Sequence, residues 1–422
     1  MTTELWDVIA KKRDGRPLSE QDINLVVHMV PQMDPVQIGA FLMACRIHGL
    51  SPDETAHLTE RMAFSGESLE PAPGRVDKHS TGGVGDKMSI ILAPLLAAHG
   101  LTVPMLAGRG LAHTGGTIDK LESIPGFITN LTLDEMRTNP CFISSQTEDI
   151  APTDRILYAA RDLTATVDEI GLITASIVSK KVAEGLERLV LDVKCGAAAF
   201  MRTEEDAVAL ATSMVDAATA LDVDTIAHVT RMDAPIGRMV GNAHEIVECI
   251  ECLQGRGPHD TMELVILQAE ALGVKDPHVH LKDGSALEAF KAMCIRQGVH
   301  PDTSERLCED PWSVLDRYPL RIPLHAPATG FIVDIDALEM GRALLRAGAG
   351  RAKQGEAIDH SIGVEILFPL GSYVKQGDVM AFYDGPLMGS ELYLADCFKI
   401  GDVAPKAMSR LIRTIRSSDN RT

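Results

Sequence analysis

The chain has 422 residues, more than a single hydrophobic core usually holds, so we expect two or three domains. Its formal net charge of −19 and its aromatic share of 4% argue against a nucleic-acid-binding protein, which needs a basic surface or stacked aromatic side chains. The acidity does not exclude a small anionic substrate, because the donors inside a pocket matter more to such a ligand than the net charge.

The N-terminus carries no signal-peptide pattern, and no apolar run reaches the ~18 residues of a membrane span. Eight cysteines are scattered along the chain, and the one close pair, Cys249 and Cys252, has no second pair to complete a zinc site. We therefore expect a cytoplasmic protein with buried, reduced thiols, no metal centre and no organic cofactor.

Residues 1–65 show helical patterns only. Ser19, Asp34 and Ser51 each stand where a helix N-cap is expected, and a proline follows the last two at the first helical position. Short amphipathic helices cannot bury their apolar stripes alone. We expect them to pack on one another and on a second subunit.

The segment EPAPGR at residues 70–75 precedes a change of pattern. RVDK and TVPML predict short strands, and each is followed by a glycine-rich loop and a helix. The same alternation returns with LERLVLDVKCG and DVDTIAHVT, residues 186–196 and 222–230. Repeated strand–loop–helix units predict an α/β fold.

The order of these patterns predicts an α/β plus all-α organisation. We expect a small discontinuous helical domain, residues 1–65 and 151–187, hinged to a larger α/β domain, residues 70–150 and 188–319. Glycine turns between alternating apolar residues predict a strand-rich, barrel-sandwich-like module over residues 320–422. Lipoyl carriers have a similar pattern, but the lysine that they modify is not found in these turns.

Two glycine-rich loops carry the first candidate site. They are VDKHSTGGVGDK at residues 76–87 and AGRGLAHTGGTIDK at residues 107–120. A loop from a strand into a helix points backbone N–H groups at one place, and glycine lets the backbone approach an anion closely. The candidate side-chain donors to a phosphate are Lys78, Ser80, Thr81, Ser89 and Thr117. Neither loop has the spacing of a standard nucleotide motif, so simple tight turns remain an alternative.

His79 is the candidate acid or donor in the first loop, because a histidine beside a phosphate can give up a proton near neutral pH. His113 is its competitor in the second loop and has no charged neighbour in the sequence. Ser176 and Lys180 share one helix face, and Arg161 ends the preceding helical pattern. Spacing alone leaves a solvated surface as the other interpretation of these three residues.

Four segments closely resemble the thymidine phosphorylase and pyrimidine-nucleoside phosphorylase family. They are KHSTGGVGD, GRGLAHTGGTIDKLESIPGF, YAARDLTATVDEIGLITASIVSKK and EGLERLVLDVKCGAAAF, in the family's order and spacing. The resemblance implies a pentosyltransferase of pyrimidine salvage. It converts thymidine or deoxyuridine with inorganic phosphate, the co-substrate, into free base and 2-deoxy-α-D-ribose 1-phosphate. It also implies a homodimer formed through the helical domain.

The resemblance assigns roles to particular positions. His79, Arg161 and Lys180 match catalytic positions, with His79 protonated and bound to O2 of the base. Phosphate-binding positions match Lys78, Ser80, Ser89 and Thr117. Base-binding positions match His79, Tyr158, Arg161, Ile173, Ser176 and Lys180.

Some positions depart from the family pattern or bear on substrate choice. Ala107 stands where relatives usually carry a phosphate-binding serine, and Ala112 replaces a usual glycine. Some relatives bind potassium near Glu248, and here Lys87 falls beside that place, so its ammonium is a candidate to make the ion unnecessary. Met105 is the sugar-adjacent position, and its methionine implies thymidine over uridine, because an apolar thioether leaves a 2′-hydroxyl unpaired.

Three alternatives stay open. One is a broader pyrimidine-nucleoside phosphorylase that also uses uridine. A second is a phosphoribosyltransferase of the anthranilate type, which shares the architecture but would need acidic ligands for Mg²⁺ near its loops. The third is a non-catalytic nucleoside-binding protein, for which Ala107 is the one motif change.

Overall fold

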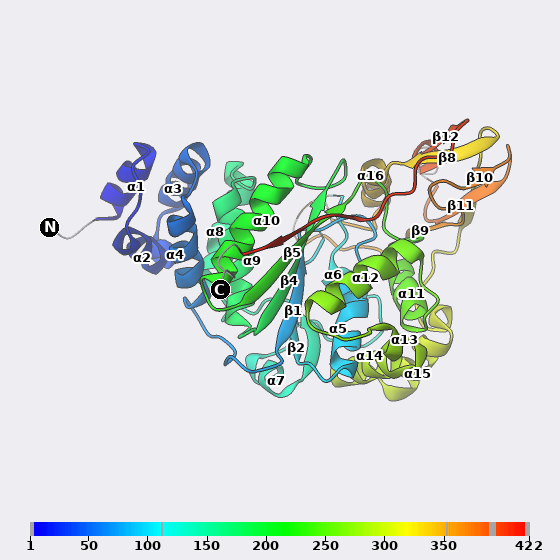
Figure 1. Cartoon of the computed structure of the whole chain (residues 1–422), viewed down its shortest axis with the longest axis horizontal. Coiled ribbons are helices and arrows are strands. Elements are labelled where there is room, and N and C mark those ends of the chain that lie inside the picture. The colour runs from blue at the N-terminus through cyan, green and yellow to red at the C-terminus, as the bar shows by residue number, and fades with distance from the viewer. Residues whose placement is uncertain (1–3, 111–112, 352, 354, 388–393, 418–422) are drawn as a thin grey trace.

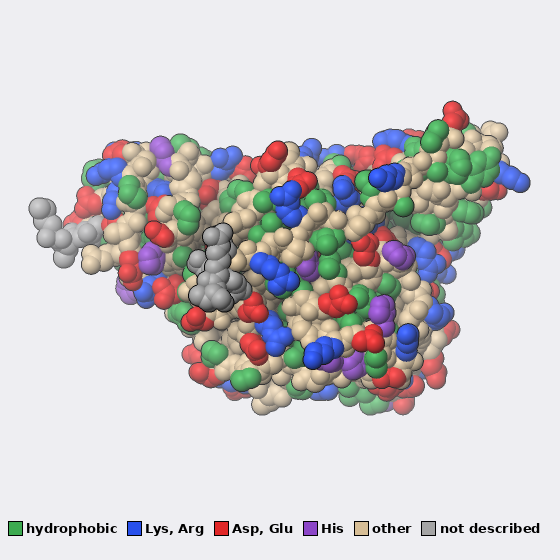
Figure 2. Space-filling model, in the orientation of Figure 1, with side chains coloured by type: hydrophobic (Ala, Val, Ile, Leu, Met, Phe, Trp, Pro, Cys, Tyr) green, Lys and Arg blue, Asp and Glu red, His purple; other side chains and the backbone are tan. Residues whose placement is uncertain are grey.

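The computed structural model describes residues 4–110, 113–351, 353, 355–387 and 394–417. Figure 1 shows a helical layer at the N-terminal end, a central sheet flanked by helices, and a strand-rich region at the opposite end. The expected combination of a small helical domain with a larger α/β domain is confirmed. On the face shown in Figure 2, acidic and basic side chains are interspersed rather than gathered in a basic stripe.

The helical layer is built from helices of two chain segments. They are α1 (Leu5–Arg13), α2 (Glu20–Met29), α3 (Pro35–His48), α4 (Pro52–Ala63), α8 (Pro152–Thr164) and α9 (Ile170–Ala183), with the short 3₁₀ helix η1 (Val30–Gln32) after α2. Ser19, Asp34 and Ser51 cap their helices as expected. Leu157 of α8 and Leu172 of α9 share one apolar core with α1–α4, so the second segment packs on the first.

The central sheet contains the predicted strands. Its order is β1 (Val76–Ser80), β4 (Arg188–Cys195), β5 (Asp224–Arg231) and β13 (Leu411–Arg416); the first three are parallel and β13 is antiparallel to β5. A parallel bridge between Arg75 and Thr102 joins β1 to a second parallel pair, β2 (Val103–Leu106) and β3 (Cys141–Ser144). Strand β2, which follows β1 in the chain, thus lies on one side of β1, and β4 lies on its other side.

Helices cover both faces of this sheet. One face packs against α5 (Met88–Ala98), α11 (Asn242–Leu253), α12 (His259–Ala271) and α14 (Ser285–Arg296). The other face packs against α9 and α10 (Glu204–Thr219). Shorter helices complete the domain: α6 (Thr117–Leu121), α7 (Leu133–Thr138), α13 (His278–Lys282), α15 (Pro301–Glu309) and η2 (Pro311–Ser313).

The strand-rich region contains two small sheets and a helix. One sheet has the order β6 (Met239–Gly241), β9 (Gly363–Ile366), β11 (Val379–Asp384) and β7 (Arg321–His325). The other has the order β10 (Tyr373–Val374), β8 (Gly330–Ile335) and β12 (Phe398–Gly401), and α16 (Ala337–Ala347) follows β8.

Two strand pairings cross the expected boundaries of this module, 320–422. Strand β6 comes from the α/β segment and pairs with β9. Strand β13 (Leu411–Arg416) lies outside the module and pairs with β5. Its backbone groups form hydrogen bonds with the edge of the central sheet that β4 does not cover. The sequence does not show the partners of either strand, because each partner is far away along the chain.

The thiols and the helices agree with two further expectations. All eight cysteine side chains are buried, and burial raises the pKa of the Cys249 and Cys252 thiols, which keeps them protonated and unreactive. Within the described ranges, no helix is both long enough and apolar enough to cross a bilayer.

The order of the strands determines where a ligand can bind. Because the chain turns from β1 toward β2 while β4 lies on β1's other side, the loops that follow these strands separate at their carboxyl ends. Crevices at such switch points are the usual ligand sites of open α/β sheets. Both glycine-rich loops leave the sheet there.

Candidate active site

The first glycine-rich loop holds a buried cation beside hydroxyl groups. Lys78, on β1, is 2% exposed. Its Nζ donates to Oγ of Ser89 at 3.3 Å and lies 3.5 Å from Oδ1 of Asp86. Ser89 lies in the first turn of α5, whose N-terminus favours negative charge. The structure therefore brings Lys78 and Ser89 together as predicted.

Asp86 is the centre of this loop, and sequence reasoning missed it. The Ser80 hydroxyl donates to Asp86 Oδ2, and Ser80 Oγ accepts the N–H of Gly82 at 3.1 Å. Burial would raise the pKa of Asp86, but the ammonium groups of Lys194, Lys78 and Lys120 outweigh it and hold that pKa well below its ordinary value. Asp86 is therefore an anion that already engages two of the candidate phosphate ligands.

Two buried lysines complete this cluster. Lys194 Nζ lies 3.8 Å from Asp86 Oδ2 and 2.6 Å from Asp192 Oδ2. Lys120 donates to the backbone carbonyl of Asp86 at 2.6 Å and pairs with Glu245 at 2.8 Å. The repeated Asp-Lys at the end of each glycine-rich loop was the available sequence signal for Asp86 and Lys120.

The second loop approaches the same crevice. Thr117 is the first residue of α6 and is half-buried. His113 Nε2 lies 3.1 Å from the carbonyl oxygen of Ala198, so its ring is held by the segment after β4. Phe200, in that same segment, is 58% exposed beside His113, and sequence reasoning did not single it out. The backbone N–H of Ala107 donates to Ser144, while Ala112 lies outside the described residues.

The third predicted group lies on α8 and α9. Lys180 Nζ donates to Ser176 Oγ at 3.2 Å and to Oδ2 of Asp154, a buried carboxylate on α8 that sequence reasoning missed. Among the described residues, Oδ1 of Asp154 has no hydrogen-bond partner. Ile173 lies one turn before Ser176 and packs partly against the core beneath α9. The predicted pairing of Ser176 with Lys180 on one helix face is thus present.

Arg161 lies in the same helical layer and is 3% exposed. Its guanidinium donates to the carbonyl oxygens of Leu172 at 2.9 Å and Val167 at 2.6 Å, and its Nε has no partner in the described part of the chain. Burial lowers the pKa of Arg161. The ring of Tyr158, which is 51% exposed, lies 5.9 Å from its Cζ. These contacts fix the guanidinium between α8 and α9.

His79 lies between the two clusters. Burial lowers its pKa well below the ordinary value, and the ammonium groups of Lys181, Lys180 and Lys78 lower that pKa further, while Asp86 opposes them. The imidazole is therefore within electrostatic reach of both the helix that carries Lys180 and the loop that carries Lys78. This shift favours the neutral ring when neither reactant is bound, and a protonated His79 in the complex stays a prediction.

Met105 lies on strand β2, which is covered on both faces, and its side chain is 1% exposed within the main apolar core. Lys78 is enclosed to a similar degree, at 2%. The preference between sugars that Met105 implies therefore stays a prediction.

Lys87 occupies a fully buried place next to the first loop. Its Nζ donates to the carbonyl oxygens of Met239 at 2.8 Å and Ile236 at 3.1 Å, and it lies 3.3 Å from Glu248 Oε2. Burial would lower the pKa of Lys87, but Glu248 and Glu245 raise it above the ordinary value. The ammonium thus has three oxygen partners of the kind that would otherwise hold a cation.

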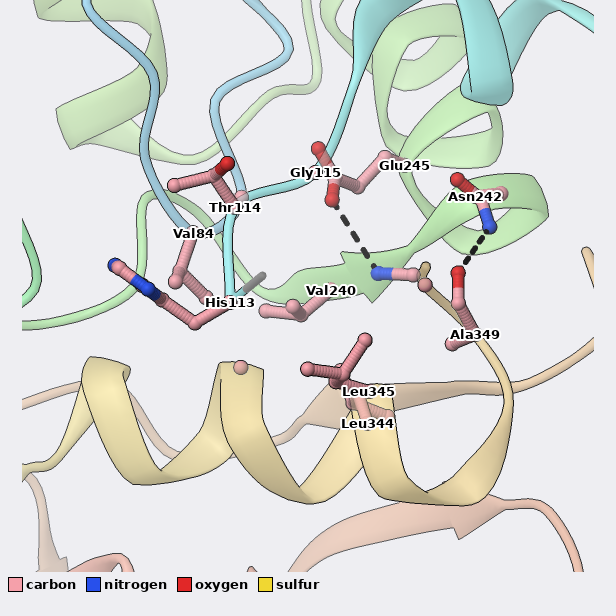
Figure 3. A pocket seen from close by; sticks show the side chains of 14 residues that line it. Val84, His113, Thr114, Gly115, Val240, Asn242, Glu245, Leu344, Leu345 and Ala349 are labelled. Atoms are coloured by element: carbon pink, nitrogen blue, oxygen red, sulfur yellow. Dashed lines mark hydrogen bonds between the residues drawn. The ribbon is translucent and has the colours of Figure 1, made fainter. Parts of the chain in front are cut away.

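A small cavity lies on the other side of the second loop (Figure 3). It has a volume of about 40 Å³ and is lined by His113, Thr114 and Gly115 together with residues of α11 and α16. Glu245 accepts the N–H of Gly241 at 3.3 Å, and Asn242 donates to Ala349 at 2.9 Å across it. Such a volume holds only ~3 water molecules. A nucleoside does not fit there, and the described residues that line this cavity include none of the predicted base-binding ones.

Comparison with known proteins follows the same division of the chain. Residues 72–292 match the model of the glycosyl transferase family, a/b domain, and residues 7–66 match its helical bundle domain. Residues 331–383 match the pyrimidine nucleoside phosphorylase C-terminal domain.

Curated relatives are similar over nearly their full length. The chain is 42% identical to thymidine phosphorylase of Homo sapiens, over 96% of this chain and 90% of that protein. It is 39% identical to thymidine phosphorylase of Agrobacterium fabrum, over 97% and 98%. It is 41% identical to pyrimidine-nucleoside phosphorylase of Geobacillus stearothermophilus, over 88% and 90%.

The fold also resembles a solved structure, anthranilate phosphoribosyltransferase from Thermus thermophilus. The TM-score is 0.55 at 16% identity, over 69% of this chain and 99% of that one, which shows a shared fold alone. With domain models covering most of its length and relatives at 39–42% identity, the chain belongs to this glycosyl transferase family and to its thymidine and pyrimidine-nucleoside phosphorylase group.

Proposed function

We propose that this protein catalyses the reversible phosphorolysis of thymidine and deoxyuridine, releasing the pyrimidine and forming 2-deoxy-α-D-ribose 1-phosphate. The observation that carries the proposal is the place of His79. It lies between a buried cationic cluster suited to phosphate and a second cluster of donors suited to a pyrimidine edge. The relatives named thymidine phosphorylase support the choice of reaction.

Phosphate is the nucleophile, and the first cluster is suited to hold it. Lys78 supplies a charge-assisted donor, and the hydroxyls of Ser89, Ser80 and Thr117 supply neutral ones. The Ser80 hydroxyl donates to Asp86 in this structure, so a phosphate must compete with Asp86 for that hydroxyl. Ala107 offers no hydroxyl, and a water molecule can replace the missing contact.

The departing pyrimidine gains negative charge as the glycosidic bond breaks. Lys180, Ser176 and Arg161 present donors from α8 and α9, where such charge would develop. Fixed donors aimed at developing charge usually contribute the largest share of catalysis. Asp154 keeps Lys180 extended toward Ser176 before a base arrives.

His79 acts in this scheme as a neutral imidazole. Its pKa is depressed by burial and by neighbouring ammonium groups, so at pH 7 one ring N–H can donate to O2 of the base while the ring carries no charge. A phosphate dianion bound beside Lys78 would raise the pKa of His79. Transfer of the proton to the leaving base then becomes easier once both reactants are present.

Potassium does not fit at the place that the resemblance suggests. The Lys87 ammonium already takes the carbonyl oxygens of Ile236 and Met239 and the carboxylate of Glu248. A monovalent cation there would lie against a positive charge. We therefore propose an enzyme that needs no potassium, with phosphate as its co-substrate rather than a metal or organic cofactor.

A second copy of this chain is the partner that we propose for the helical layer. Val36, Ala40, Met43 and Ile47 form an exposed stripe along α3, at the spacing of a helix–helix seam. Leu163 of α8, 88% exposed, extends the apolar surface beside it. Helix α3 packs on α8, so the two helices that carry these exposed apolar side chains are neighbours. An isologous dimer buries such a stripe against itself.

The reaction itself is tested by product release from thymidine and from uridine, each with and without phosphate. We expect thymine release only with phosphate, and slower release of uracil. Comparable rates from both nucleosides would favour the broader substrate range of the Geobacillus stearothermophilus relative's group. Thymine release without phosphate would contradict the proposal.

Two serine variants, one in each donor cluster, distinguish binding of the nucleoside from binding of phosphate. We expect Ser176→Ala to raise the KM for thymidine or lower kcat by about 5- to 10-fold, the loss of one hydrogen bond, with the KM for phosphate unchanged. Ser89→Ala should instead raise the KM for phosphate by a similar factor. The control is Ser179→Ala on the same helix, which should remain within about twofold in both. The measurement is steady-state kinetics with either thymidine or phosphate varied. If Ser176→Ala raised the KM for phosphate and Ser89→Ala raised the KM for thymidine, the assignment of the two clusters would be refuted.

The role of Lys87 is tested by thermal unfolding as well as by activity. Replacing potassium with sodium should leave the wild-type rate and unfolding midpoint unchanged. Lys87→Met should lower the midpoint, because the Glu248 carboxylate then stays buried without a counter-charge, at a cost of about 3–5 kcal/mol. Potassium should restore part of that loss in the variant alone. If potassium stabilised or activated the wild-type enzyme, the Lys87 ammonium would not be a replacement for the ion.

The dimer is tested by sedimentation of the wild type and of two variants. Wild-type protein should sediment as a dimer, and the combined variant Val36→Glu with Ile47→Glu should sediment as a folded monomer. Val403→Glu is the control, because Val403 is an exposed apolar residue away from α3. Dimers that survive the double substitution would place the interface elsewhere.

A further inference from the structure

A buried cluster of charged side chains joins α9 to β1, and the reaction scheme above uses it only through the effect of Lys181 on the pKa of His79. Lys181 lies on α9 between Asp77 of β1 and Glu184, the residue that ends α9, and each side chain is at most 1% exposed. Lys181 Nζ donates to Asp77 Oδ2, to Glu184 Oε1 at 2.7 Å and to the carbonyl oxygen of Leu106 at 2.9 Å. Three segments of the chain therefore meet at one ammonium group.

The two carboxyl groups of this cluster differ in their environment. Burial raises the pKa of Glu184 well above its ordinary value, Lys181 opposes this effect, and the neighbouring Asp77 carboxylate adds to it. These effects favour the neutral form of Glu184 beside the ion pair of Lys181 with Asp77. Such a buried group is costly to break but contributes little net stability, because desolvation offsets most of the attraction.

The position of the cluster in the chain points to a purpose other than stability. Asp77 directly precedes Lys78 and His79 on β1, and Lys181 directly follows Lys180 on α9. Each partner is thus one or two residues from a candidate site residue of a different donor cluster. Leu106 ends β2 and directly precedes Ala107 at the start of the second glycine-rich loop.

Apolar packing already holds α9 against the sheet. Val178 and Val182 of α9 share a core with Leu189 and Leu191 of β4. Apolar contacts fix the face that a helix presents, but they allow it to slide or rotate by a fraction of a turn. The directed hydrogen bonds of Lys181 to Asp77 of β1 and to the carbonyl oxygen of Leu106 on β2 remove that freedom, while Glu184, at the end of the same helix, orients the ammonium.

We propose that Lys181, Asp77 and Glu184 are positioning residues that hold the base-binding helix in register with the phosphate-binding strand. This inference rests on the proposed phosphorolysis, in which Lys180 and His79 must reach the base while Lys78 holds phosphate. The cluster touches neither reactant. It sets the separation of the two half-sites, and a misplacement of about 1 Å can cost about 100-fold in rate.

The test is Lys181→Met, which keeps the length and apolar stem of the side chain and removes the ammonium. We expect kcat for thymidine phosphorolysis to fall about 30- to 100-fold. Thymine alone and phosphate alone should still bind within about twofold of the wild-type affinities, because each half-site stays intact. A kcat within about threefold of wild type, or a parallel loss of both affinities, would overturn the positioning role.

Glu184 supplies a second variant in case Lys181→Met folds poorly. Glu184→Gln reproduces the neutral acid and should keep kcat within about threefold, whereas Glu184→Ala should lose about 10-fold or more. Equal kcat values for the two variants would count against the cluster. The matched control is Lys12→Met, which breaks another buried ion pair, with Glu54 at 2.8 Å, inside the helical layer. That variant should lose stability while the folded fraction keeps its kcat.

Failure of the proposed function gives a different result from failure of this inference. A wild-type protein that binds thymine and phosphate without turnover would refute the phosphorolysis. The positioning role is then measured as the factor by which saturating phosphate changes the affinity for thymine. That factor should be lost in Lys181→Met, and an equal factor in both proteins would overturn the inference.

Discussion

The structure depends on pairing each buried lysine with a carboxylate. Lys87, Lys120, Lys181 and Lys194 are among the largest side chains that are fully enclosed, and each lies within hydrogen-bond reach of an aspartate or glutamate. An unpaired ammonium in such places would cost several kcal/mol. The pairs therefore constrain which segments can be neighbours, and all four lie around the crevice where β1, β2 and β4 end.

Local features of the fold were predictable from the sequence, whereas these pairs were not. Ser19 and Ser51 cap their helices as their positions indicate, because capping depends on residues within one turn. The pairing of Lys181 with Asp77 spans 104 positions, and nothing in either motif marks it. Lys78, Ser89, Ser176 and Lys180 lie where the motifs placed them, but Asp86 and Asp154, which hold two of them, required the structure. The enclosure of Met105 likewise depends on which distant segments pack on β2.

The charge state of His79 shows why a side chain's type alone does not determine its role. A histidine near a phosphate motif suggests an acid, but three ammonium groups and burial favour the neutral ring. In the proposed reaction Lys78 and Lys180 bind the two reactants, and they also lower the pKa of His79, which lies between them. The same arrangement gives phosphate a second effect, since its negative charge relieves the repulsion that keeps His79 neutral.

The return of β13 to the central sheet has a consequence for synthesis of the chain. Strand β5 ends at Arg231, and its partner begins at Leu411, so the edge of β5 stays unpaired until almost the whole polypeptide has left the ribosome. Closure of a sheet over so long a separation is slow, and an unpaired strand edge is a template for intermolecular pairing. Nascent chains and prematurely terminated chains therefore expose the unpaired edge of β5, which is prone to aggregation until β13 pairs with it.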